Sequence, residues 1–110
     1  MVRPIPRKLL IHTIEYKHLI GNNGWDDEFD DPVKIIRVRV VPTSRIHHTM
    51  QSESREATHR VFMDRQYSKP FLELSEGSRV TWQGKEFTVG KVSIHYDFSE
   101  TPHHYEVELW

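Results

Sequence analysis

Apolar and polar residues alternate with a period of two along most of this chain, the pattern of β-strands with one buried face. β-Branched and aromatic residues, which favour strands, are dense in the same segments. We therefore predict strands over residues 7–20, 33–41, 59–67 and 103–110. Gln83-Gly84 separates two more strand-like runs, which indicates a hairpin with its turn at residues 83–85.

The same alternation predicts which side chains share a face. In the first strand, one face would carry Leu10, His12, Ile14, Tyr16 and His18. In the second, Ile36, Val38 and Val40 would lie opposite Arg37 and Arg39. Gly90 is expected to mark a bulge in the second arm of the hairpin. Short strands at regular intervals indicate a mainly β protein, a small antiparallel β-barrel or sandwich-like single domain with long polar loops.

Polar segments separate these strands. Residues 1–6 hold two prolines, which fix φ and remove donors, so we expect an extended N-terminal arm. Residues 21–31 place five acidic residues around Trp25 and Phe29 and predict an acidic loop. Residues 43–56 lack apolar periodicity and predict a long polar loop, of a length that usually serves a function in so small a domain. A turn is expected at residues 97–102.

Composition narrows the classes of function. A length of 110 residues fits one domain, and 15 Lys and Arg against 16 Asp and Glu give a net charge of -1. Bulk charge therefore does not predict nucleic-acid binding. The chain has no cysteine, which excludes disulfides and thiolate metal sites and fits a reducing compartment. The N-terminus lacks the apolar segment of a secretion signal, and we expect no membrane association.

Eight histidines suggest metal binding, because imidazole is a common ligand, and two adjacent pairs stand out, His47-His48 and His103-His104. Adjacent residues on a strand point to opposite faces, so neither pair chelates one ion easily. We therefore expect no metal and no other cofactor. In this interpretation His104 is partly buried and hydrogen-bonded, and the other histidines are exposed.

Catalytic patterns are also missing from the sequence. It has no GxSxG, no phosphate-cradling glycine loop and no HExxH. The acidic residues near Trp25 lack the spacing of a calcium-binding EF-hand, because Phe29 and Pro32 interrupt them. We expect a protein that is not an enzyme, with the acidic segment either solvated or facing a basic partner.

Several motifs resemble one family, the minor capsid proteins of siphophages and prophages of Gram-positive bacteria. In the first two thirds of the chain they are Arg3-Pro4-Ile5-Pro6, Lys8-Leu9-Leu10-Ile11-His12, Asp31-Pro32-Val33 and Phe62-Met63-Asp64. Towards the C-terminus they are Gly77-Ser78-Arg79-Val80, Gly84-Lys85-Glu86-Phe87-Thr88-Val89, residues 96–98 and His103-His104-Tyr105-Glu106-Val107. The resemblance spans nearly the whole chain.

The resemblance implies a head-completion or stopper role, as a homo-oligomeric ring in the neck of the virion that helps retain packaged DNA. The implied partners are further copies of the chain, the portal or adaptor, and tail-completion proteins, with the host cytoplasm as the location before assembly. For assembly contacts we expect Arg3, Pro4, Trp25 and Phe29. For a loop facing the channel or a partner we expect Arg45, His47, His48, Arg55 and Arg60. Glu53 and Glu56 would cancel part of that positive charge, so an ordinary mixed-charge surface is the alternative.

Other roles stay open at this stage. A tail-completion or capsid-decorating role fits the same family. A small barrel that binds peptide or single-stranded nucleic acid would use exposed aromatics, for which the candidates are Trp25, Trp82, Tyr96 and Trp110. Burial of these side chains would exclude that alternative, and several of them lining one open groove would support it.

Overall fold

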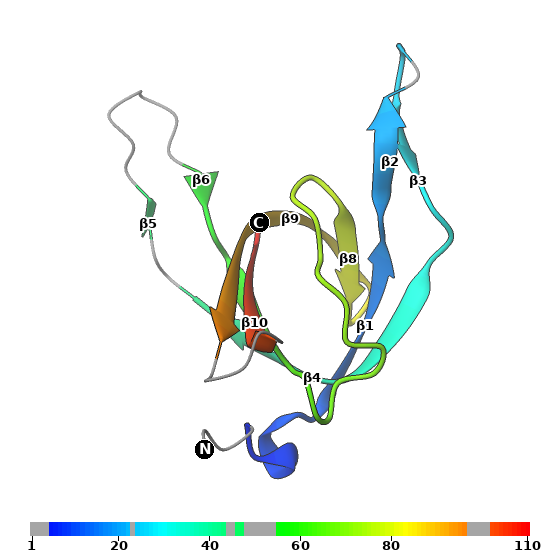
Figure 1. The fold of residues 1–110 in the computed structure, drawn as a ribbon. Coiled ribbons are helices and arrows are strands. Elements are labelled where there is room, and N and C mark those ends of the chain that lie inside the picture. Colours follow the sequence, from blue (N-terminus) through cyan, green and yellow to red (C-terminus); the bar gives the residue numbers. More distant parts are fainter. Residues whose placement is uncertain (1–4, 23, 44–45, 48–54, 97–101) are drawn as a thin grey trace.

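Six antiparallel strands close into a barrel in the order β1-β4-β7-β10-β9-β8 (Figure 1). The structure is a computed structural model and describes residues 5–22, 24–43, 46–47, 55–96 and 102–110. The strands of the barrel are β1 (His12–Lys17), β4 (Val33–Pro42), β7 (His59–Asp64), β8 (Arg79–Trp82), β9 (Lys85–Tyr96) and β10 (Pro102–Leu109). Pairing of β1 with β8 closes the ring of strands. The prediction of a small antiparallel β-barrel is confirmed.

The core fills the inside of the barrel with side chains that alternate along most of its strands. In β10 the alternation is strict, with residues 103, 105, 107 and 109 buried and the residues between them half-buried on the outer face. The largest fully buried side chains are Ile14, Ile35, Met63, Leu74 and Leu109. Phe71 and Tyr105 stack in parallel, with ring centroids 4.4 Å apart. The predicted core face of the first strand is confirmed for Leu10, Ile14 and Tyr16, whereas His18 is exposed.

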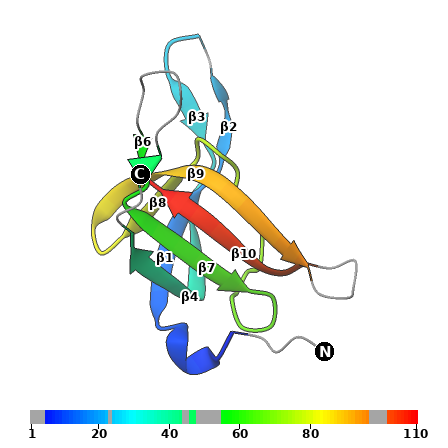
Figure 2. The same cartoon turned by 90° about the vertical axis from the view of Figure 1, so that its left-hand side faces the viewer.

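Two hairpins rise from the same end of the barrel, which we call the hairpin end (Figures 1 and 2). One is formed by β2 (Leu19–Asn22) and β3 (Asp27–Phe29), the other by β5 (Ile46–His47) and β6 (Arg55–Glu56). The prediction that residues 21–31 form a loop is therefore wrong in part, because β2 and β3 continue the β1–β4 pair beyond the barrel. The described ends of the predicted 43–56 loop likewise pair as strands, and residues 44–45 and 48–54 lie outside the described residues.

The N-terminal segment lies at the opposite end, which we call the arm end (Figures 1 and 2). Arg7–Leu9 form a 3-10 turn closed by the Leu10 N–H, which donates to the Arg7 carbonyl at 3.0 Å. The predicted strand over 7–20 began too early, because β1 begins only at His12, and it is divided after Lys17 into β1 and β2. Of the predicted extended arm, residues 1–4 lie outside the described part of the chain.

A bulge in β4 corrects the predicted burial of the second strand. Ile35 and Val38 are fully buried, three residues apart, while Ile36 is only half-buried. The cause is Arg37, whose φ of 56° puts an extra residue into β4 opposite β1. The Arg37 carbonyl accepts a 2.6 Å hydrogen bond from the buried Ser68 hydroxyl, which holds this irregular backbone in place.

The β8–β9 hairpin matches its prediction. Gln83 and Gly84 both have positive φ, 50° and 76°, as a two-residue turn of this kind requires. The β9–β10 register shifts opposite Gly90, between Val107 and Leu109, which confirms the expected bulge. Of the turn expected at 97–102, residues 97–101 lie outside the described residues, and β10 already begins at Pro102.

Two further predictions need correction. The third strand ends at Asp64 rather than at residue 67, because the Asp64 carboxylate turns the chain there. The histidines are arranged as expected only in part. His104 is half-buried and hydrogen-bonded, as predicted, whereas His103 is buried, with 7% of its surface exposed, and His12 and His59 are half-buried.

Candidate functional site

The β2–β3 hairpin presents a large aromatic side chain to solvent. Trp25 is 92% exposed, more than any other large hydrophobic residue among those that the structure describes. Asp26, Asp27 and Glu28 follow it and are exposed as well. Tryptophan contributes strongly to binding when a partner buries it, so Trp25 is a candidate for contact with another protein.

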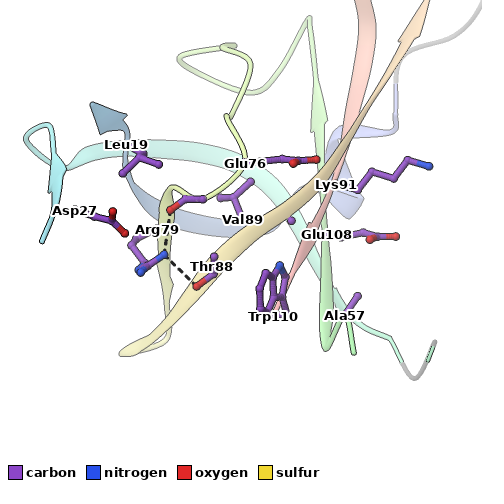
Figure 3. Close-up of a pocket in the computed structure, with 12 residues that line it drawn as sticks. Leu19, Asp27, Ala57, Glu76, Arg79, Thr88, Val89, Lys91, Glu108 and Trp110 are labelled. Atoms are coloured by element: carbon purple, nitrogen blue, oxygen red, sulfur yellow. Dashed lines mark hydrogen bonds between the residues drawn. The ribbon is translucent and has the colours of Figure 1, made fainter. Parts of the chain in front are cut away.

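A cavity of about 580 Å³ opens at the hairpin end, beneath the two hairpins. Asp27 and Arg79 lie on one side of it, and Lys91, Glu108 and Trp110 on the other (Figure 3). Its lining mixes both charges with apolar surface, including Leu19, Ala57 and Val89. Such a lining suits a polypeptide segment better than a small apolar ligand.

Arg79 joins the β2–β3 hairpin to the barrel. Its Nη1 donates to the Gly77 carbonyl at 3.0 Å and to the Thr88 hydroxyl at 3.1 Å (Figure 3). Its guanidinium also lies 5.1 Å from the centre of the Phe29 ring. Phe29 is therefore half-buried against the barrel, whereas Trp25 of the same hairpin is exposed.

At the arm end, one carboxylate holds the N-terminal segment on the barrel. Asp64 is 1% exposed, and its Oδ1 accepts a 2.9 Å hydrogen bond from the Ile5 N–H. Its Oδ2 accepts from the N–H groups of Gln66 at 2.9 Å and Tyr67 at 3.3 Å. Beside this contact lies a second cavity of about 360 Å³, lined by Ile5, Leu9, Arg39, Phe62, His104 and Glu106.

The structure separates the residues predicted for the channel or partner loop. Arg45 and His48 lie outside the described residues, and so do the predicted arm contacts Arg3 and Pro4. His47 and Arg55 pair across β5 and β6. Arg60 instead lies in β7, in the barrel wall, and its Nη2 is 3.6 Å from Glu108 Oε1.

His12, His59 and Trp82 form an aromatic cluster on the barrel. The Trp82 ring meets His12 edge-on at 5.1 Å and His59 at 5.7 Å. His12 Nδ1 accepts a hydrogen bond from the Val40 N–H at 3.0 Å. It takes the place of a backbone acceptor near the irregular part of the β1–β4 pairing. Burial, and then the Arg39 charge, lower the pKa of His12 below its usual value. Burial and Lys85 lower the pKa of His59 in the same way.

Comparison with known proteins gives one match. A family model described as minor capsid protein matches residues 6–109, nearly the whole chain. The chain belongs to the minor capsid protein family. No curated protein and no solved structure gives a match. The resemblance seen in the sequence is therefore confirmed at the level of the family, and with it a structural role in the phage particle.

The aromatic side chains of this minor capsid protein do not gather in one groove. Trp25 lies on the β2–β3 hairpin, and Trp82 is half-buried against the core. Trp110 lines the larger cavity, and Tyr96 is exposed at the end of β9. Of the four, only Trp110 lines either cavity described above. Neither of these two cavities is therefore lined by several of the four aromatics, the arrangement that would support a module binding peptide or single-stranded nucleic acid.

Sequence reasoning missed one group of side chains in the minor capsid protein. His95 of β9 and His104 and Glu106 of β10 meet on the outer face of the barrel, with one ligand atom of each within 4.8 Å of the others. Burial, then the neighbouring His95 and His103, lower the pKa of His104. The signal present in the sequence was the His104-x-Glu106 spacing, which puts both side chains on one face of a strand.

Within the described residues, no helix has the length and apolar character needed to span a membrane.

Proposed function

We propose that this minor capsid protein is a ring subunit of the neck between head and tail, with a stopper-like role that helps retain packaged DNA. The observation that carries the proposal is the division of the molecule into two ends (Figures 1 and 2). Two hairpins rise from one end of the closed barrel, and the N-terminal segment is held at the other. A subunit built in this way has a distinct surface for each of two neighbours along an axis.

The closed barrel supports assembly through these projections rather than through its strands. A closed sheet has no free edge, so strand addition to the barrel is not open to a partner. The exposed Trp25 with its acidic neighbours fits a basic or aromatic-binding surface on the portal or adaptor. The arm end would then face the tail-completion proteins, and copies of the chain would pack laterally through the barrel walls.

Retention of DNA would depend on the segment 43–56. Its ends form the β5–β6 hairpin. Arg45 and Arg55 would supply positive charge there, Glu53 and Glu56 would offset part of it, and His47 and His48 would add to it when protonated. Repetition around a ring multiplies a modest charge per subunit into a field that a phosphate backbone meets in a channel. Arg60 would contribute less, because Glu108 partly neutralises it.

Deletion of the gene from an inducible phage tests the role. We expect separate tails and heads that have lost their DNA, because a missing stopper leaves the channel open and the tail without its attachment surface. Complementation with the wild-type chain should restore complete particles. Complete, infectious particles without the protein, or particles that lose infectivity only on heating, would contradict the proposal and favour decoration of the capsid.

A variant of the hairpin end tests the proposed contact. Trp25→Ala should lower the titre in the complementation assay while the free energy of unfolding of the isolated chain stays the same, because the side chain is 92% exposed. Trp25→Phe is the matched control and should keep most of the titre, since it retains an aromatic side chain. A normal titre with Trp25→Ala would show that Trp25 is not part of the assembly surface.

A further inference from the structure

Three side chains with metal-binding atoms converge on the outer face of the β9–β10 pair. His95 lies directly opposite His104 in the register of the two strands, and Glu106 is two residues further along β10. His104 and Glu106 therefore project from the same face, next to His95. Neighbouring residues 103, 105 and 107 point into the core, which keeps the group on the surface side of the barrel.

The three groups lie close to the spacing of a single-ion site, with one ligand atom of each within 4.8 Å of the others and the two histidines beside different oxygens of Glu106. His95 Nε2 lies 3.2 Å from Glu106 Oε2, and His104 Nε2 lies 3.8 Å from Glu106 Oε1. Ligand atoms bound to one zinc ion at about 2.0–2.2 Å are about 3.3 Å apart in a tetrahedral site. The imidazole rings of His95 and His104 are stacked in parallel, at 2°, with centroids 4.4 Å apart. Because an ion lies near the plane of each imidazole that binds it, the exposed His95 ring would rotate about its side-chain bonds when the ion binds.

His103 orients the central ligand. Its Nδ1 lies 2.9 Å from His104 Nδ1, so one of these two nitrogens carries the shared proton. When His104 Nδ1 is the donor, the lone pair of His104 is on Nε2, the atom that faces Glu106. His103 is 7% exposed and packs edge-on against His104, with ring centroids 5.2 Å apart. A buried partner that fixes the tautomer of a ligand histidine is a common feature of metal sites.

We propose that His95, His104 and Glu106 form a binding site for a divalent transition-metal ion of the zinc class. Two imidazoles and one carboxylate are a donor set for zinc, nickel or copper, whereas calcium and magnesium prefer oxygen ligands alone. Three protein ligands leave a fourth position to water or to a donor from outside the chain. The exposed His95 leaves room for that donor, and the cavity lined by Ile5, Leu9 and Phe62 lies beside the site.

The ion would act as a clamp between the ends of two strands. It would join β9 to β10 where their register shifts, between Pro102 and His104. Binding to the folded state alone raises stability with ion concentration. The site does not depend on the proposed role in the neck, because the three ligands belong to one chain.

Zinc titration of the untagged, EDTA-treated chain tests the site. We expect one zinc ion per chain by calorimetry and a rise in the unfolding midpoint of about 5 °C or more at a large excess of zinc. Calcium should cause no rise. Long-range ¹H–¹⁵N spectra should show zinc-dependent shifts at Nε2 of His95 and His104. The proton of the hydrogen bond between His103 Nδ1 and His104 Nδ1 should be retained.

Variants separate this site from adventitious binding. His95→Ala and Glu106→Gln should each weaken zinc binding about tenfold or more, and circular dichroism should show that both variants still fold, since His95 is exposed and Glu106 lies on the outer face. His18→Ala, a matched control at another exposed histidine, should bind zinc as the wild type does. Unchanged affinity in His95→Ala, or zinc-dependent shifts confined to other histidines, would overturn the proposal. The wild-type spectra decide the question even if a variant fails to fold.

Discussion

Asp64 is the residue on which the arm end depends. It is buried in the barrel wall, yet its two carboxylate oxygens accept three backbone hydrogen bonds from residues outside any strand. The Ser68 hydroxyl accepts a further bond from the Asp64 N–H at 2.9 Å and donates to Arg37. The Asp64 side chain thus links the N-terminal segment to the turn after β7, and the Asp64 backbone N–H links this turn through Ser68 to the bulge in β4.

Replacement of the Asp64 side chain should loosen the N-terminal segment and the turn after β7, whereas the bond to Ser68 comes from the Asp64 backbone N–H and should remain. Asp64→Ala leaves three N–H donors without their acceptor, so we expect a loss of about 3 kcal/mol in the free energy of unfolding. Asp64→Asn retains one acceptor oxygen and should lose less. Urea unfolding measures the loss, and hydrogen exchange of the Ile5 amide measures the release of the N-terminal segment. Unchanged protection of Ile5 in Asp64→Ala would show that another contact holds the segment.

His12 and His59 should make the fold sensitive to acid. Both have a folded pKa below the usual 6.5, so as the pH falls below 6.5 the unfolded chain takes up protons first and the folded state loses stability. Protonation of His12 Nδ1 would also break its bond with the Val40 N–H. The charges facing these rings are Arg39 and Lys85, which oppose a further positive charge.

The measurement compares urea midpoints at about pH 7.5 and about pH 5.5. The wild type should lose stability at the lower pH, and the double variant His12→Asn, His59→Asn should lose less. Asparagine supplies an acceptor near the position of Nδ1 but does not titrate. Carboxylates titrate equally in both proteins, so an equal loss in both would show that other groups cause it.

The β9–β10 pair depends on the absence of a side chain at one position. A Cβ on Gly90 would lie 2.7 Å from Trp110 Nε1 and 2.9 Å from Trp110 Cδ1, so the indole ring packs directly against this backbone. The Trp110 backbone in turn exchanges two hydrogen bonds with Thr88, of 2.8 and 3.0 Å. The bulge and the C-terminal residue thus form one unit, at the edge of the larger cavity.

Gly90→Ala should displace the Trp110 ring and cost about 2 kcal/mol in the free energy of unfolding. Gly21→Ala is the matched control, because a Cβ there meets no atom within 4 Å, and it should change stability little. In a double-mutant cycle, Trp110→Ala should remove most of the penalty of Gly90→Ala. Additive effects of the two substitutions would contradict the contact.

Elements with a regular period of two were predictable from the sequence, and irregular ones were not. The turn at Gln83-Gly84 and the alternation in residues 103–109 depend on local chemistry, so their strands could be placed. The burial of Ile35 in place of Ile36 could not be predicted, because the left-handed backbone of Arg37 is held by a hydrogen bond from Ser68, 31 residues away. The acidic segment around Trp25 forms a hairpin because it continues a pair of barrel strands, which its polar composition does not indicate.

The candidate sites needed the register between strands. His104 and Glu106 could be placed on one face from their spacing alone, but only the antiparallel pairing of β9 with β10 brings His95 beside them. The interpretation of His103-His104 as a pair was incomplete for the same reason. His103 does point into the core and His104 outwards, and the further ligands come from across the strand and two residues along it.

At the scale of the whole molecule, the protein is a closed barrel with two dissimilar ends. The barrel offers no strand edge to a neighbour, and the exposed aromatic and the cavity of about 580 Å³ are gathered at the hairpin end. The arm end carries the N-terminal segment, the smaller cavity and the His95, His104 and Glu106 cluster. This polarity is what a subunit needs if it contacts one kind of ring above and another below.

A cryo-EM reconstruction of particles encoded by the same genome tests the proposed place in the neck most directly. We predict a ring of this barrel below the portal, with the β2–β3 hairpin and Trp25 against the portal or adaptor and the segment 43–56 directed into the channel. Density for the barrel on the outer capsid shell, or none in the particle, would contradict a role in the neck.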